Sequence, residues 1–115
     1  MEAKAEHRFA RISPHKTRPV MDLVRGAAAN EALAVLEFTP NRAAKFITKV
    51  IKSAVANAGY DVDPEDLWIS EARVDEGPTR TWWRAGTRGM AFPIRRRSCH
   101  IRVVVTDAPR VEAEG

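Results

Sequence analysis

The chain has 115 residues, a length that fits one domain with a modest hydrophobic core. Its 44% hydrophobic residues include no apolar run near the roughly 20 residues of a membrane span, and its first residues lack the apolar stretch of a signal peptide. The single cysteine, Cys99, excludes an internal disulfide. These features predict a cytoplasmic protein that has no membrane partner.

The formal net charge of +4 conceals an uneven distribution of charge along the chain. Residues 77–106 contain seven arginines and no acid, whereas the rest of the chain holds twelve basic residues against fifteen acidic ones. Clustered like charges repel each other unless a polyanion neutralises them, and the planar guanidinium group suits phosphate. A nucleic acid is therefore the favoured partner. A solvated basic surface is the alternative, above all for a second acid-free stretch at residues 38–60.

The first two predicted elements are a strand over residues 4–12 and a helix over residues 14–25. In the strand, Phe9 is the expected core contact. Ser13 is a good N-cap for the helix, because serine is favoured at the cap and proline is favoured at the first helical position after it. Pro19 lies inside the helix and removes one backbone hydrogen bond, so a kink or a 3₁₀-like start is expected.

Two more helices are predicted, over residues 30–38 with Asn30 as the cap and over residues 41–58. The third helix is the clearest element, because its apolar residues recur at three- and four-residue spacing and Gly59 follows its end. Its polar side carries four basic residues, namely Arg42, Lys45, Lys49 and Lys52.

An acidic turn and two strands complete the expected body. The turn, residues 61–66, lacks the glycine and the final glutamate of a calcium loop, so no metal site is predicted. A strand over residues 67–75 should contain a bulge or be buried on both faces, because its apolar alternation shifts. In the last strand, residues 97–106, alternation places Cys99 toward the core and His100 on the opposite face. These two side chains therefore cannot form a catalytic pair.

Residues 79–96 are predicted to form a long β-hairpin arm, with Gly86 and Gly89 at its tip. At about 3.3 Å per residue the tip would stand about 30 Å out. An arm of this kind buries little of itself and is marginal alone, so a partner should stabilise it. Its arginines are interleaved with three aromatic residues, Trp82, Trp83 and Phe92. This pattern matches phosphate contact combined with base stacking; packing of the tryptophans on a neighbouring strand or another protein is the alternative.

Five blocks of sequence in a fixed order resemble the large-subunit ribosomal protein L22 family of bacterial type. They read HRFARISPHKTRPVMDLVRG, NEAL, SAVANA, VDEGPT and RRRSCHIRVVV, and they span nearly the whole chain. The resemblance implies an α+β fold in which three helices pack on a small antiparallel three-stranded sheet with a long protruding β-hairpin. It implies one domain over residues 1–115, with a body at about 1–78 and 97–110 and the arm at about 79–96.

The resemblance also implies a function without enzymatic activity and without a cofactor. Members of the family are structural constituents of the large ribosomal subunit that bind and organise its RNA during assembly. The body would lie near the exit of the nascent-peptide tunnel, and the tip of the arm would line that tunnel. The implied partners are large-subunit ribosomal RNA, neighbouring ribosomal proteins and the nascent peptide, with the protein present as a monomer within the ribosome.

The predicted site residues combine the arginine-rich stretches with the positions that match the family's motifs. The predicted RNA-binding residues are Arg11, Ser13, Lys16, Arg18, Arg25, Arg80, Arg84, Arg88, Arg95, Arg96, Arg97, Ser98, His100 and Arg102. The predicted tunnel-facing tip comprises Gly86, Thr87, Arg88, Gly89, Met90 and Ala91.

The arm departs from the family's usual sequence at the tip and at two tryptophans. The usual Pro-Arg-Ala-x-Gly-Arg-Ala tip is replaced by Ala-Gly-Thr-Arg-Gly-Met-Ala. Trp82 and Trp83 stand where basic and aliphatic residues are usual, and both are candidates for stacking. Neighbours on a strand point to opposite sides, so we expect one to stack on RNA bases or an arginine and the other to face a neighbouring protein or the tunnel wall.

Three other classes of protein fit the sequence less well. A winged-helix DNA-binding regulator also has three helices and a two-stranded wing, but the third helix here offers mainly lysines rather than base-reading side chains. A KH-type RNA module places its Gly-x-x-Gly loop between helices, whereas residues 86–89 lie between predicted strands. For an enzyme, the sequence offers no phosphate loop, no metal-ligand cluster and no nucleophile with a base.

Overall fold

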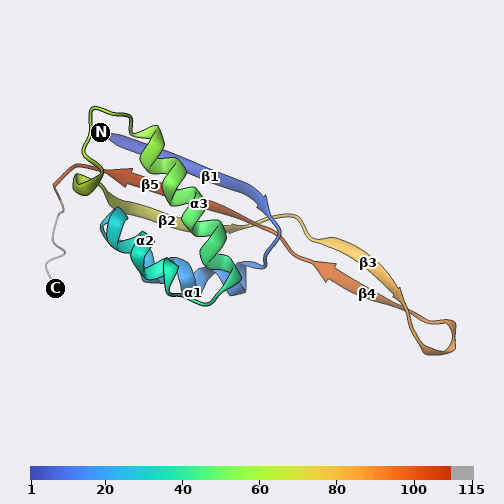
Figure 1. Ribbon diagram of the computed structural model, residues 1–115. Helices are drawn as coiled ribbons and strands as arrows, with labels where there is room; N and C mark the ends of the chain where they lie inside the picture. Colours follow the sequence, from blue (N-terminus) through green and yellow to red (C-terminus); the bar gives the residue numbers. More distant parts are fainter. Residues whose placement is uncertain (110–115) are drawn as a thin grey trace, which may run out of the picture.

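A computed structural model describes residues 1–109 as a body of three helices on a sheet, from which a two-stranded arm projects (Figure 1). The helices and strands are β1 Glu2–Ala10, α1 Pro14–Val24, α2 Ala29–Glu37, α3 Arg42–Asn57, β2 Trp68–Glu76, β3 Arg80–Ala85, β4 Ala91–Arg96 and β5 Cys99–Thr106. Two 3₁₀ turns add Pro64–Asp66 before β2 and Thr87–Gly89 at the tip of the arm. The α+β fold predicted from the sequence is confirmed.

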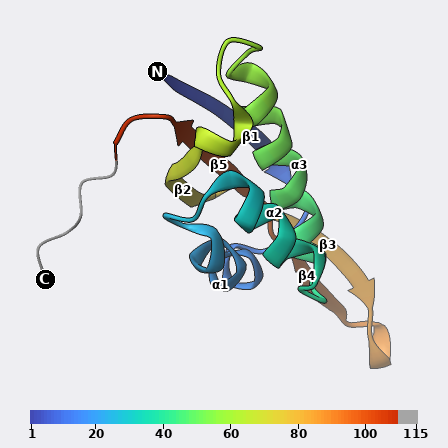
Figure 2. The same ribbon diagram turned by 60° about the vertical axis from the view of Figure 1, so that its left-hand side comes forward.

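The body is a three-stranded antiparallel sheet in the order β1-β5-β2, with the helices on one face (Figures 1 and 2). α3 packs on β1 and β5, and α1 packs on β2. The central strand β5 sends Cys99, Ile101, Val103 and Val105 into the core, where all four are buried. The expected bulge in β2 is confirmed, because its register against β5 shifts between Ile69 and Glu71.

The third helix matches its prediction within one residue at each end. The side chain of Asn41 accepts a hydrogen bond from the Ala43 amide at 2.9 Å, which caps the helix start. Ile47 and Ile51 are fully buried on its inner face. Gly59 follows with a φ of +86°, the left-handed conformation that ends helices most easily with glycine.

The first helix ends at Val24, one residue before the prediction, and one hydrogen bond at its start spans three residues, as in a 3₁₀ turn. Ser13 holds the N-cap position, but its side chain makes no capping hydrogen bond. Its carbonyl oxygen instead accepts from the Lys16 amide at 3.2 Å and from Thr17 Oγ1 at 3.0 Å. The helix continues through Pro19, which lies inside it.

Two predictions about side chains in the body are wrong. Phe9 was expected in the core, but its side chain is 57% exposed, because a φ of +59° at the irregular end of β1 turns it outward. Asn30 was expected to cap the second helix, but α2 begins at Ala29 with Ala28 as the cap. The Ala29 amide donates instead to the Leu67 carbonyl at 3.0 Å, so a backbone partner from the start of β2 replaces the side-chain cap.

Two strands of the body also differ slightly from their predicted bounds. β1 runs two residues earlier than expected at both ends, and β5 begins at Cys99 instead of residue 97. Residues 97–98 therefore belong to the connection between body and arm. The predicted body extended to residue 110, which lies outside the described residues together with the rest of the C-terminus.

The arm is a regular antiparallel hairpin that gives the molecule an elongated shape of 62 × 32 × 25 Å. Gly86 and Gly89 flank its tip as predicted, and Gly89 has a φ of +71°. Within β3 and β4 every residue except Ile94 is exposed. The arm therefore has almost no core of its own, in keeping with the marginal stability expected for an isolated hairpin.

Candidate nucleic-acid interface

The body joins the arm through a narrow neck formed by Gly77, Pro78, Arg97 and Ser98. The Gly77 amide donates to the Ser98 carbonyl at 3.0 Å, and Ser98 Oγ donates to the Pro78 carbonyl at 2.8 Å. A Cβ on Gly77 would lie 2.5 Å from Ser98 Oγ and 3.2 Å from Ser98 backbone atoms. Glycine is therefore required for the segments at Gly77 and Ser98 to approach this closely. Ser98 also has a structural role in the neck that RNA binding does not explain.

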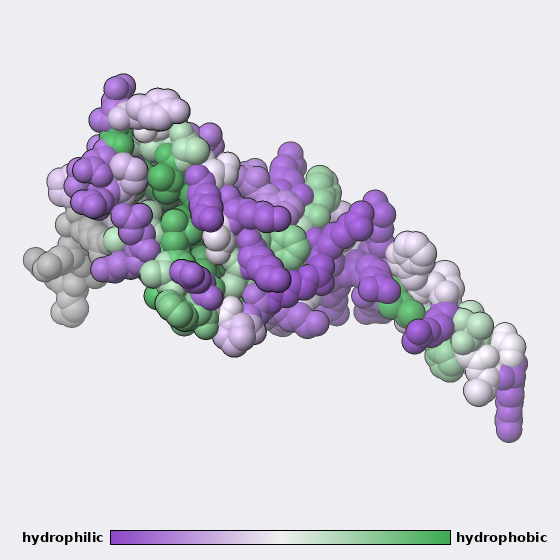
Figure 3. All heavy atoms as spheres, in the orientation of Figure 1, coloured by the Kyte–Doolittle hydropathy of each residue, from purple (hydrophilic) through white to green (hydrophobic). Residues whose placement is uncertain are grey.

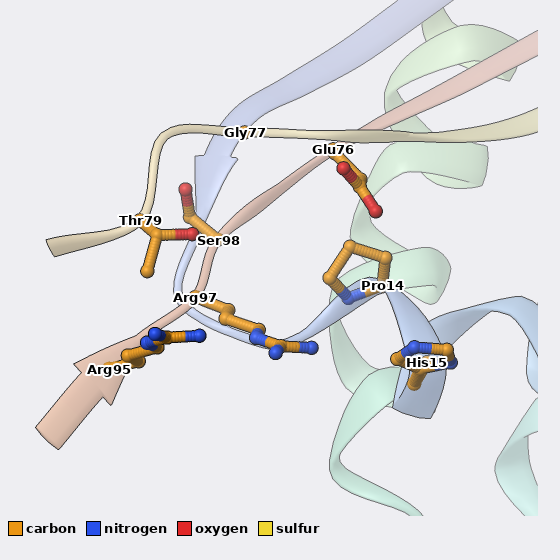
Figure 4. A pocket seen from close by; sticks show the side chains of 8 residues that line it. All are labelled: Pro14, His15, Glu76, Gly77, Thr79, Arg95, Arg97 and Ser98. Atoms are coloured by element: carbon orange, nitrogen blue, oxygen red, sulfur yellow. The ribbon is translucent and has the colours of Figure 1, made fainter.

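A hollow of about 330 Å³ opens beside the neck (Figure 4). Its lining residues are Pro14, His15, Glu76, Gly77, Thr79, Arg95, Arg97 and Ser98. Arg95 and Arg97 project on the same side of the chain, and the Arg97 side chain extends toward His15 at the start of α1 (Figure 4). Two guanidinium groups and an imidazole against one carboxylate make this hollow suited to an anion such as a phosphodiester.

Six arginines on the arm and neck present their charge to solvent. None of them makes an ion pair or a side-chain hydrogen bond with another residue of the described part of the chain, 1–109. They are Arg80, Arg84, Arg88, Arg95, Arg96 and Arg97. Figure 3 shows hydrophilic surface around the junction of body and arm and again at the far end of the arm, with a mixture of pale, hydrophobic and hydrophilic surface between. Unneutralised arginines spaced in this way suit contact with successive phosphates of a nucleic acid.

Arg102 differs from these six arginines. It lies on the central strand β5, where its guanidinium is half-buried and 3.7 Å from Glu6. Its Nε is buried without a hydrogen-bond partner in the described structure. The structure thus places Arg102 in the sheet of the body, although the sequence analysis grouped it with the arginines of the arm. RNA binding by this residue remains a prediction.

Two predicted RNA-binding residues on and after α1 hold the body together. The Arg25 guanidinium donates to the Ala72 carbonyl at 3.2 and 2.7 Å and pairs with Asp22. Arg18 donates to the Val74 carbonyl at 3.5 Å. Both contacts tie α1 to β2, whereas Arg11 and Lys16 are exposed and remain available to a partner.

His100 and Cys99 lie on opposite faces of β5, as the alternation predicts. His100 Nδ1 accepts from the Phe9 amide at 3.0 Å, and the His100 ring meets the Phe9 ring edge-on at 4.9 Å, so only its other nitrogen can meet a ligand. Burial raises the pKa of the Cys99 thiol, whose sulfur lies 3.8 Å from Thr17 Oγ1. A buried neutral thiol is a core residue and not a nucleophile.

The basic side predicted for the third helix lines a groove beside α2 and α3, although its residues were not among the predicted RNA-binding residues. A groove of about 720 Å³ runs there, and its lining includes Asn41, Glu37 and the exposed side chains of Arg42, Lys45, Lys49 and Lys52. The acid-free stretch at residues 38–60 was the signal for it. His15 and Thr79 in the hollow at the neck were missed as well, because only the fold brings them beside Arg95 and Arg97.

Residues 1–109 contain no cluster of three or more His, Cys, Asp or Glu side chains able to hold a metal ion. No helix within the same range is long and apolar enough to cross a membrane.

A small α+β body that carries an arginine-rich arm without a core is typical of proteins that bind structured RNA. The family model described as ribosomal protein L22p/L17e matches residues 5–106, and the chain belongs to this family. The chain is 50% identical to the large ribosomal subunit protein uL22 of Lactobacillus helveticus over 107 residues. These aligned residues make up 91% of this chain and 92% of that protein. The uL22 proteins of Desulforamulus reducens and Halothermothrix orenii are 50% and 48% identical over 109 residues, 93% of this chain and 96% of theirs.

Family membership accounts for features that the alternatives leave unexplained. It covers the body and the arm together, whereas a winged-helix regulator or a KH module would account for the helices or the tip alone. The family consists of ribosomal proteins, so the hypothesis of an enzyme also has no support.

Proposed function

We propose that the protein is a structural constituent of the large ribosomal subunit in the cytoplasm and that it binds and organises large-subunit ribosomal RNA during assembly. The observation that carries this proposal is the family match over residues 5–106, which includes the whole arm. The exposed, unpaired arginines of the arm support it physically, because their mutual repulsion is relieved by a polyanion.

Within the subunit, we place the body near the peptide exit and the tip of the arm in the wall of the nascent-peptide tunnel. The length of the molecule, 62 Å, is compatible with an arm that reaches well away from the body. The tip presents Thr87, Arg88 and Met90, all exposed, to its surroundings. The neighbours of the arm are ribosomal RNA, adjacent ribosomal proteins and the nascent peptide, and the protein is a monomer within the ribosome.

Tight and salt-dependent RNA binding is the expected result for the isolated protein. If about six arginines contact phosphates, the slope of log affinity against log salt should be near −4 to −5, at about 0.7 to 0.9 per contact. Filter binding of a large-subunit RNA fragment at several salt concentrations measures this slope. A slope near zero would remove the arm from the RNA interface and contradict the proposal.

A further inference from the structure

The register of the arm sorts its side chains into two unlike faces. Residues directly opposite each other in an antiparallel pair share one face of the hairpin. The arginine face is made by the pairs Arg80–Arg96, Trp82–Ile94 and Arg84–Phe92. The neutral face is made by the pairs Thr81–Arg95, Trp83–Pro93 and Ala85–Ala91, and its single charge lies at the neck end.

Trp82 occupies the middle of the arginine face. Along β3 it has Arg80 on one side and Arg84 on the other, two residues away in each direction. It lies opposite Ile94, the only residue of β3 and β4 that is not exposed, while its own side chain is 60% exposed. An exposed indole beside an aliphatic side chain and between two cations has the form of a stacking platform.

Phe92 extends this platform toward the tip. Its ring lies so close to Gly86 that a Cβ on that glycine would be 2.0 Å from Phe92 Cε2. The ring is therefore held against the backbone at the base of the tip, and it is still half-exposed. Trp82 and Phe92 occupy adjacent rows of this face, with Arg84 opposite Phe92 and the pair Arg80–Arg96 on the neck side of Trp82, so the face offers both rings for bases and cations for phosphates of a single RNA strand.

The neutral face lacks the charges that such a strand needs. Trp83 is 68% exposed, close to the value for Trp82, but it lies opposite Pro93 and beside two alanines. The one arginine of the neutral face, Arg95, lines the hollow at the neck. A strand laid along this face would leave its phosphates unneutralised beyond the neck.

We propose that the arginine face of the arm binds unpaired nucleotides of RNA, with Trp82 as the residue on which a base stacks, and that Trp83 takes no part in RNA binding. This inference rests on the proposed function, because it names the form of RNA that the arm takes. It assigns opposite roles to two adjacent tryptophans that differ little in exposure.

The two single variants Trp82→Ala and Trp83→Ala test the assignment against each other. Each removes one exposed indole from the same strand, so the structural losses are matched. The probes are a short oligoadenylate and a blunt-ended RNA duplex, titrated at equal salt. Trp82→Ala should weaken binding of oligoadenylate about five- to a hundredfold and change duplex binding little. Trp83→Ala should change binding of either RNA less than about twofold, and Trp82→Phe should recover most of the loss since a phenyl ring also stacks.

The outcomes separate this inference from the proposed function. Equal losses for the two alanine variants, or a loss for Trp82→Ala that is as large on the duplex, would overturn the role of Trp82 while RNA binding itself stands. Wild-type protein that binds neither RNA in a salt-dependent way would overturn the proposed function. Retained amide protection in α3 of both variants shows that the body is folded in each comparison.

Discussion

Replacement of Arg95, Arg96 and Arg97 by alanine is expected to cause the largest loss of RNA binding. All three are exposed and unpaired within the described residues, and they run from the end of β4 into the neck. The slope of log affinity against log salt should flatten by about two to three units, at about 0.7 to 0.9 per lost phosphate contact. With other terms unchanged, this corresponds to about a hundred- to a thousandfold weaker binding at about 0.1 M salt.

A charge-preserving variant provides the control for this result. Replacement of the same three arginines by lysine keeps the charge, so the salt slope should stay near that of the wild type. Some affinity should still be lost, because lysine cannot form the bidentate contact of a guanidinium group. If the alanine variant keeps the full slope, these three residues do not contact RNA phosphates.

The second large effect is a difference in amide hydrogen exchange between the two parts of the free protein. α3 lies over a continuous core with Ile47 and Ile51 fully buried, so amides of residues 46–55 should open only with global unfolding, at about 5 to 15 kcal/mol. Among residues 81–91 of the arm only Gly86 is not exposed, so the opening free energy of these amides should be about 0 to 1 kcal/mol.

RNA should remove most of that difference. Addition of a large-subunit RNA fragment is expected to slow exchange in the arm by at least about tenfold, while α3 changes little, because the RNA contacts replace the core that the arm lacks. Exchange measured by mass spectrometry with and without RNA checks both statements. Strong protection of residues 81–91 in the free protein would show that the arm is stable by itself.

Elements whose start, core face and end are all encoded locally were predicted best. α3 has a capping asparagine, an apolar stripe at helical spacing and a glycine after its end, and these signals agree. Phe9 and Asn30 were mispredicted because partners distant in sequence decide their surroundings. Phe9 donates its amide to His100 Nδ1, and the start of α2 finds its partner in the Leu67 carbonyl.

The residues of the candidate site also differ in how far the sequence alone predicts their roles. Exposure of the arm arginines follows from composition, because a stretch with seven arginines and no acid cannot pair its charges internally. The roles of Arg18 and Arg25 depend on carbonyl groups of β2 that only the folded body brings within reach. Alternation along β3 predicts that Trp82 and Trp83 face apart. The residues that β4 adds to each face depend on the pairing register, which the structure supplies.

The central claim, that this protein is a constituent of the large ribosomal subunit held by RNA, is tested most directly by sedimentation. Tagged protein, expressed in the cells from which the sequence derives, would be followed through a sucrose gradient before and after a high-salt wash. We expect it to sediment with the large subunit and to stay there after the wash, because an arm enclosed by RNA would have to break many contacts together. Protein found at the top of the gradient, or stripped by salt while other large-subunit proteins remain, would contradict the account.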